Sequence, residues 1–208
     1  LFSLNNAKKN QDRTLILCEG YMDVIAVNQA GFQNAVATLG TALTSQQASV
    51  MKRYADDVII CYDADEAGQK ATQRAIGILR RTGLNIRVLT VPDGKDPDEF
   101  IRKHGDNGGA AFYNLVNGSF NDVEYQLSKV RKKYDLKLAD QRVKYVNEAI
   151  NIIAKIDDDV ERDVYSSKLA DETGVHTESI SNSLKRVRSK IKSVSYTHLR
   201  AHETRRHL

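Results

Sequence analysis

Short apolar runs alternate with helix-like patterns over the first 91 residues of the chain. Four runs have the continuous apolar character of strands that are covered on both faces; they lie at 14–18, 34–39, 57–62 and 86–91. Between them, apolar positions recur at helical spacing at 21–30, 44–54 and 66–82, the second segment opening on a capping box of Thr44 and Gln47. This alternation predicts an α/β domain in which a parallel sheet carries helices on its faces.

The pattern changes after Pro92, and the rest of the chain shows helical spacing only. Helices are expected at 97–104, 110–116, 120–134, 136–156, 160–172 and 177–192. We therefore expect a lead-in over 1–13, an α/β domain over 14–96, an all-α subdomain over 97–192 and a tail over 193–208.

The tail, SVSYTHLRAHETRRHL, has neither helical nor strand periodicity. It holds three of the five histidines, at 198, 202 and 207. Because the run resembles a translated sequencing adaptor, we interpret it as non-native and exclude it from the fold. We do not expect its histidines to bind a physiological metal.

Composition narrows the class of protein. The chain has 208 residues, of which 41% are hydrophobic and 28% charged, as in ordinary folded proteins. Its apolar runs are far shorter than a membrane span, and no signal peptide opens it. Since it starts with Leu1, we expect a cytoplasmic fragment of a longer protein. Cys18 and Cys61 each lie inside an apolar run, which indicates buried thiols rather than a zinc cluster.

The net charge of +4 gives little support to a nucleic-acid interface by itself. The first hundred residues contain 11 Lys and Arg against 12 Asp and Glu, so they are close to neutral. The positive balance comes from the second half and from the tail.

Acidic side chains follow three of the predicted strands. Glu19 directly follows the first strand, Asp63 and Asp65 follow the third, and Asp96 and Asp98 follow the fourth. Ligands bind at the carboxyl ends of strands in open α/β sheets, so these side chains would share a crevice if the first and third strands are neighbours. Clustered carboxylates favour a divalent cation such as Mg²⁺. The alternative for each of them is a helix N-cap or a solvated loop residue.

Four sequence strings together resemble the TOPRIM domain of bacterial replicative DNA primases of the DnaG type. They are LCEGYMDV at 17–24, ATLGTA at 37–42, CYDADEAG at 61–68 and PDGKDPD at 92–98. A Glu with an Asp-x-Asp fits any TOPRIM protein, whereas the EGYMD and DGKDPD strings point to the primases. The helical remainder, to about residue 192, is similar to the helical subdomain of that family.

The resemblance implies roles for six carboxylates. Glu19 would bind the catalytic Mg²⁺, Asp63 would bridge two Mg²⁺ ions, and Asp65 would bind the second, with Mn²⁺ as a substitute. Further acidic positions, expected to support the site, are Asp23, Asp96 and Asp98. A role of Glu19 as general base stays open beside its role as ligand.

The implied activity is that of a DNA-directed RNA polymerase. Such a primase makes short RNA primers on a single-stranded DNA template from ribonucleoside triphosphates, by Mg²⁺-dependent nucleotidyl transfer. Primases of this type also have an N-terminal zinc-binding domain, a basic subdomain and a C-terminal helicase-binding domain. We expect all three to be missing, so that the chain holds no zinc and the replicative helicase binds elsewhere. The fragment would then keep the metal site but lack much of the template-binding surface, and no membrane partner is expected.

Two other classes of TOPRIM protein are alternatives. A nuclease or a topoisomerase-like enzyme would share the acidic residues, but a topoisomerase needs a nucleophilic tyrosine in a separate domain. A non-catalytic DNA-binding recombination module would keep the fold, but its usual four-cysteine zinc motif is absent from the sequence. We therefore expect a primase.

Overall fold

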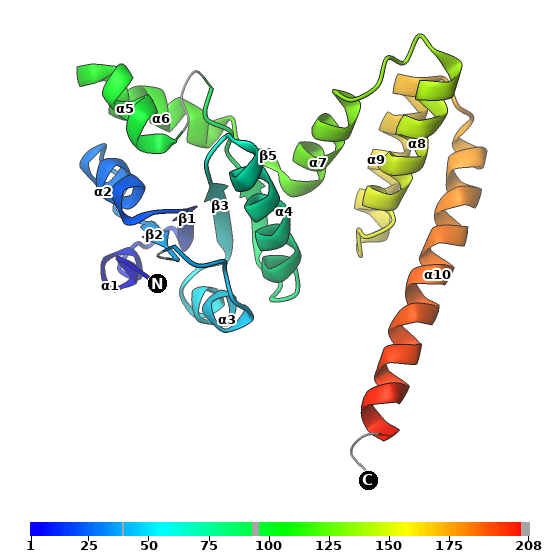
Figure 1. The fold of residues 1–208 in the computed structure, drawn as a ribbon, viewed down its shortest axis with the longest axis horizontal. Coiled ribbons are helices and arrows are strands. Elements are labelled where there is room, and N and C mark those ends of the chain that lie inside the picture. Colours follow the sequence, from blue (N-terminus) through cyan, green and yellow to red (C-terminus); the bar gives the residue numbers. More distant parts are fainter. Residues whose placement is uncertain (39, 93–95, 205–208) are drawn as a thin grey trace. The chain divides into compact units, whose positions relative to one another are not determined.

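The computed structural model describes residues 1–38, 40–92 and 96–204, with side chains described as far as Ile191. The chain divides into two compact units, Leu1–Asp122 and Val123–Leu208, which are described separately (Figure 1). The boundary expected after residue 96 falls inside the first unit, because the two helices that follow it pack with the sheet.

The first unit contains a five-stranded sheet with the order β2-β1-β3-β4-β5. Its strands are β1 (Thr14–Cys18), β2 (Ala35–Ala37), β3 (Asp57–Cys61), β4 (Asn85–Val88) and β5 (Phe120–Asn121). The first four pair in parallel, whereas β5 pairs antiparallel with β4. The parallel pairing expected for the four predicted strands is therefore confirmed, and the unpredicted fifth strand makes the whole sheet mixed. The missing strand lies inside the helix predicted at 120–134, and two residues are too few to leave a strand pattern.

Helices cover both faces of this sheet. They are α1 (Leu4–Ala7), α2 (Tyr21–Gln29), α3 (Ser45–Tyr54), α4 (Glu66–Arg80), α5 (Pro97–Lys103) and α6 (Gly108–Asn117). Ile16, Cys18 and alternate residues of β3 form one apolar cluster with side chains of α2, α5 and α6. The ribbon places α3 and α4 against the opposite face (Figure 1). This two-sided burial is the reason that the strands read as continuous apolar runs.

The predicted capping box of α3 is confirmed. The backbone N–H of Gln47 donates to Thr44 Oγ1 at 3.2 Å, and the Gln47 side chain accepts from the Thr44 N–H at 2.9 Å. The α4 helix ends shortly before Gly83, whose φ of 72° lies in the left-handed region that glycine adopts without strain.

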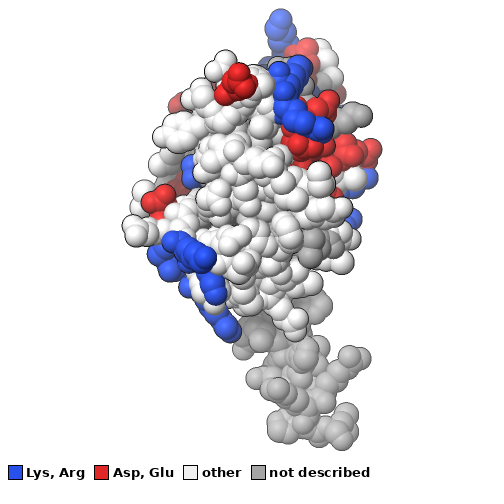
Figure 2. Space-filling model, turned by 90° about the vertical axis from the view of Figure 1, so that its left-hand side faces the viewer, with Lys and Arg blue, Asp and Glu red and all other residues white. Residues whose placement is uncertain are grey.

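One face of the first unit carries few charges over its middle. Figure 2 shows this face, formed by the helices at the left of Figure 1, with Lys, Arg, Asp and Glu gathered toward its edges. Large apolar side chains are exposed on two of these helices, at Tyr21, Met22 and Ile25 of α2 and at Tyr113 of α6.

The second unit is helical, as predicted. It contains α7 (Asp122–Arg131, beginning at the last residue of the first unit), α8 (Ala139–Ile153), α9 (Asp159–Thr173) and α10 (Thr177–Thr204). Its core includes Ile153, Leu169 and Ile180, which are almost fully buried. The backbone of α10 continues past Lys192, where the sequence predicted an end. The histidine side chains of the tail and residues 205–208 lie outside the part described, and the foreign origin of 193–208 stays a prediction.

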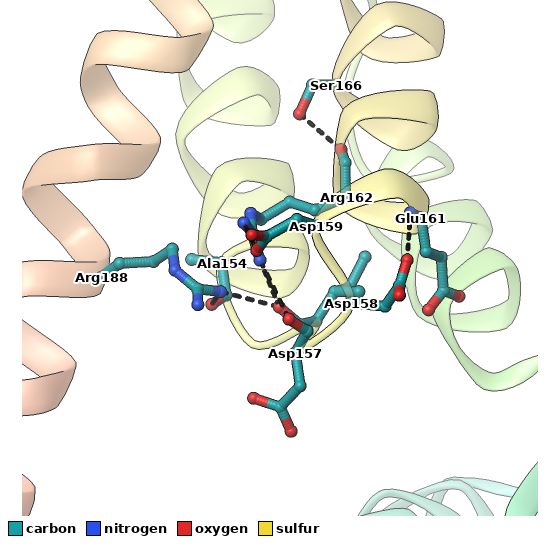
Figure 3. Close-up of polar contacts among 9 residues, drawn as sticks. Ala154, Asp157, Asp158, Asp159, Glu161, Arg162, Ser166 and Arg188 are labelled. Carbon is teal, nitrogen blue, oxygen red and sulfur yellow. Dashed lines mark hydrogen bonds and ion pairs between the residues drawn. The ribbon is translucent and has the colours of Figure 1, made fainter.

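Two arginines of the second unit converge on the end of α8 (Figure 3). Arg188 Nη1 donates to the carbonyls of Ala154 and Ile156 at 3.2 and 2.7 Å. Arg162 Nη1 donates to the same Ile156 carbonyl at 2.9 Å, and its other terminal nitrogen pairs with Asp159. Ala154 is the C-cap of α8, so Arg188 satisfies a carbonyl that the helix C-terminus leaves without a partner, and both arginines hold the chain just beyond it at Ile156.

Across the described residues, every helix is too short or too polar to cross a bilayer.

Candidate metal centre at the carboxyl edge of the sheet

The site lies where β1 and β3 end side by side. These strands pair directly, with Cys18 opposite Cys61, so the neighbour relation assumed from the sequence is confirmed. Glu19 is the next residue after β1, and Asp63 follows β3 by two residues. The register therefore brings both carboxylates to one edge of the sheet.

Glu19 carries a buried oxygen without a partner. Its Oε2 atom is buried and accepts no hydrogen bond from any described residue. A buried carboxylate oxygen that makes no hydrogen bond is costly, so such an atom in a folded protein is suited to bind a cation or a water molecule. Its position matches the metal-ligand role that the resemblance implies for Glu19.

Asp23 and Asp63 have perturbed acidities. Asp23 is only 8% exposed, and burial, opposed by its hydrogen bond from the Gly20 N–H, raises its pKa to about 6 with help from neighbouring carboxylates. Burial is also the largest cause at Asp63, where the charges of Glu19 and Asp23 help to raise the pKa to about 6. Like charges that are forced together in a low-dielectric site disfavour ionisation, and a bound cation would relieve this.

The other predicted ligand, Asp65, and the supporting residues Asp96 and Asp98 make local contacts. Asp65 Oδ1 caps α4 by accepting from the Gly68 N–H at 2.7 Å, and Asp96 Oδ1 caps α5 by accepting from the Glu99 N–H at 2.7 Å. Asp98 pairs with Arg102 at 2.5 Å. Asp65 and Asp96 thus have the N-cap role that was the alternative for single carboxylates. Both still contribute charge at Asp63, so the structure gathers them around it.

Gly68 lets the first turn of α4 approach Asp63 closely. A Cβ atom built at Gly68 would lie 2.2 Å from the carbonyl oxygen of Asp63, which is a severe clash. No larger residue fits without moving Asp63. The glycine in the string CYDADEAG is therefore needed for the position of the carboxylate.

The donor set fits a hard divalent cation, although its side chains are not arranged as a finished site. Among the residues described, no three His, Cys, Asp or Glu side chains already stand together in a way that could hold a metal ion. The buried, unpartnered oxygen of Glu19 and the raised pKa of Asp63 are nevertheless features that suit oxygen ligands of a divalent cation.

Both cysteines lie fully buried behind this edge. Burial, followed by the charges of nearby acidic groups, raises the pKa of both thiols. They are buried strand residues, as the apolar runs predicted, and their surroundings disfavour the thiolate form.

A pocket that was not predicted from the sequence adjoins Glu19. This pocket has a volume of about 330 Å³ and lies between the β2–α3 connection and α4. Its α4 wall includes Ala67, Ala71 and Ala75, with Arg74 beside them. Three alanines spaced four residues apart were the available signal, because that spacing gives a helix one face of small side chains.

Two family models match the chain. The Toprim-like model matches residues 16–101. The model for the DnaB-helicase binding domain of primase matches residues 123–178, which lie in the second unit.

The relatives and solved structures point the same way. The DNA primase of Clostridium acetobutylicum is 46% identical over 86% of this chain and 30% of its own length. The chain belongs to the DNA primase family. A DNA primase domain from Pseudomonas aeruginosa has a TM-score of 0.72 at 30% identity, over 91% of this chain and 59% of that one. A DnaG primase catalytic domain bound to single-stranded DNA has a TM-score of 0.69 at 28% identity, over 85% of this chain and 57% of that one.

Membership of the primase family bears on three expectations. It favours a primase over the other TOPRIM classes, and it implies use of a divalent metal. The expectation that the helicase-binding region is missing was wrong, because residues 123–178 match the model of such a region. Helical periodicity alone could not distinguish that role. The chain spans 30% of the length of the Clostridium acetobutylicum primase, so what it does within a whole protein is a matter for proposal.

Proposed function

We propose that this chain is the metal-binding part of a DNA primase that makes short RNA primers on single-stranded DNA during replication in the bacterial cytoplasm. The observation that carries the proposal is the unpartnered, buried Oε2 of Glu19 at the end of β1, beside Asp63 at the end of β3. The similarity to a DnaG catalytic domain bound to single-stranded DNA supports the template class.

Six carboxylates divide the work in this proposal. Glu19 and Asp63 bind Mg²⁺ directly, because their oxygens are buried or crowded by negative charge. Asp65 keeps one oxygen on the α4 cap and offers the other to a second ion. Asp23, Asp96 and Asp98 add negative charge around the site. When bound, Mg²⁺ lowers the pKa of the primer 3′-hydroxyl and stabilises the charge of the leaving pyrophosphate. Ribonucleoside triphosphates and the RNA primer are the substrates.

Metal binding is the first test. The affinity of the chain for Mn²⁺, as a paramagnetic substitute for Mg²⁺, is measured by electron paramagnetic resonance. Asp63→Asn should lower the affinity at least tenfold. Asp57→Asn, at the opposite end of the same strand, is the matched control and should leave it unchanged. Equal affinities in wild type and Asp63→Asn would contradict the proposal.

Primer synthesis is the second test, and it needs the rest of a primase. This chain replaces the corresponding segment within the Clostridium acetobutylicum primase, and primer synthesis by the hybrid is measured on single-stranded DNA. The exchange should keep activity, and Glu19→Gln in the same hybrid should reduce it at least a hundredfold. An active Glu19→Gln hybrid would rule out the proposed role of Glu19.

A second function is proposed for the helical unit. Its match to a helicase-binding model suggests that residues 123–178 contact the replicative helicase. Co-sedimentation of the chain with a bacterial replicative helicase tests this. Loss of binding after deletion of 123–208, but not after Asp63→Asn, is the expected outcome.

A further inference from the structure

The pocket beside Glu19, here called the Arg74 pocket, has walls from four parts of the first unit. They are Glu19 at the end of β1, the β2–α3 connection, Tyr62 after β3, and one face of α4. The string ATLGTA at 37–42 forms part of the connection. Thr41 Oγ1 donates to the Thr38 carbonyl at 3.0 Å, so this connection is held by its own hydrogen bond.

The α4 wall of the pocket is small and apolar. Ala67, Ala71 and Ala75 follow one another on the lining face, and Ile78 lies one turn further along it. Ala42 and Leu43 line the pocket from the β2–α3 connection. Methyl groups on both sides leave room for a flat or compact group, and they give it apolar contact.

Arg74 is the one cation among the described lining residues, and Glu19 is the one anion. Other cations of α4 have carboxylate partners, since Lys70 pairs with Glu66 at 2.6 Å and Arg80 pairs with Asp122. Arg74 makes neither an ion pair nor a hydrogen bond with any residue in the described part of the chain. Its guanidinium therefore stands at the pocket with all of its donors available.

We propose that the Arg74 pocket holds one nucleotide unit, with its phosphate on Arg74, its sugar and base against the alanine face, and its far end next to Glu19. The proposal rests on the proposed function, because it gives the substrate position beside the metal ligand Glu19. A guanidinium binds phosphate through paired hydrogen bonds, and the volume of about 330 Å³ is in the range of small-ligand sites. One cation between apolar walls matches a monophosphate unit better than a triphosphate.

Adenosine 5′-monophosphate (AMP) is the probe, titrated into the intact chain by calorimetry with and without Mn²⁺. Arg74→Gln should weaken AMP binding at least fivefold and leave the weaker binding of adenosine unchanged. Arg81→Gln is the matched control, because Arg81 is an exposed arginine that directly follows α4 and does not line the pocket. It should bind AMP as the wild type does.

A second variant tests the walls of the pocket. Ala71→Leu should fill the space and weaken the binding of both AMP and adenosine, with circular dichroism as the check that it folds. Because Arg74 is exposed, Arg74→Gln should fold normally, and it still tests the proposal if Ala71→Leu does not fold. A phosphate, a sugar and a base are also present at the end of a nucleic-acid strand, so the dinucleotide pApA is titrated as well. Tighter binding of pApA than of AMP would mean that the pocket binds the end of a nucleic-acid strand. Equal binding would mean that it binds a free nucleotide.

Two results would overturn the inference: no binding of AMP at millimolar concentration, or equal binding by wild type and Arg74→Gln. Manganese affinity, measured on the same samples, separates this failure from failure of the proposed function. If Mn²⁺ binds with an affinity that depends on Asp63, but the AMP affinity does not depend on Arg74, only the pocket assignment is wrong. If AMP depends on Arg74 while Mn²⁺ does not bind, the metal site falls and the nucleotide pocket stands.

Discussion

Asp23 shows how burial controls a single carboxyl group at this edge of the sheet. Its pKa is about 6, against an ordinary value of 3.8, chiefly because burial penalises the charged form. In the unfolded chain the group ionises near pH 3.8, so between these two values the folded protein binds more protons. The stability that this group contributes is complete below pH 3.8 and is lost as the pH rises through about 6.

The first prediction replaces this carboxyl with a neutral amide. Asp23→Asn keeps an oxygen for the Gly20 N–H and removes the buried charge, so the metal-free variant should be more stable than wild type at pH 7.5 by about 1–2 kcal/mol. At pH 4 most of that advantage should disappear. Urea unfolding in the presence of a chelator measures both values. A variant less stable than wild type at pH 7.5 would mean that the charged hydrogen bond outweighs burial.

The second prediction compares two glycines of α4. Gly68→Ala should push Asp63 aside, destabilise the chain by about 1–3 kcal/mol and weaken Mn²⁺ binding at least tenfold. Gly77→Ala is the control, since a Cβ atom there meets nothing within 4 Å. It should stabilise the chain by about 0.5–1 kcal/mol through helix propensity, with unchanged Mn²⁺ affinity. Similar effects of the two substitutions would contradict the role assigned to Gly68.

The positions of the carboxylates at the strand ends could be predicted from the sequence, but the contacts that each carboxylate makes could not. The strand ends could be found because buried strands leave continuous apolar runs, which identified Glu19 and Asp63. The capping contacts of Asp65 and Asp96 depend on where a helix begins to within one residue, which periodicity does not resolve. Arg74 was missed because an exposed arginine on a helix looks like any solvated charge until the opposite wall of its pocket is known.

At the scale of elements, periodicity served best where an element is long. Predicted helices such as those at 66–82 and 160–172 agree within two residues with α4 and α9. The strand β5 was missed because its pairing depends on β4, more than thirty residues earlier in the chain. No local pattern reports such a partner, and a two-residue strand has no period of its own.

The third prediction concerns the end of α8. Arg188→Gln removes a guanidinium that donates to the carbonyls of Ala154 and Ile156, and it should lower the stability of the second unit by about 1–3 kcal/mol. Arg186→Gln is the control, because Arg186 is exposed and has no such contacts. Urea unfolding followed by circular dichroism measures the difference. Equal stabilities would show that water replaces the arginine at no cost.

At the scale of the whole molecule, each unit has its own apolar core. Side chains of α2, α5 and α6 pack with strand residues in the first unit, whereas Ile153 and Leu169 belong to a separate cluster in the second. Separate cores allow separate unfolding transitions, because cooperativity follows packed contact.

The fourth prediction uses this separation. Mn²⁺ should raise only the unfolding transition of the first unit, since a ligand stabilises the state that binds it. Ile153→Ala should destabilise only the second unit, by about 2–5 kcal/mol. Differential scanning calorimetry of wild type and variant, with and without Mn²⁺, checks both shifts. A single transition that moves with either change would contradict the independence of the two cores.

The two cysteines give this chain a built-in reporter of its own unfolding. Cys18 and Cys61 are the only cysteines in the sequence, both are fully buried, and both lie on paired strands of the first unit. A thiol-reactive dye can therefore modify them only when the centre of that sheet opens. The rate of labelling measures how often the metal-binding edge loses its support, while opening of the second unit is silent in the same experiment.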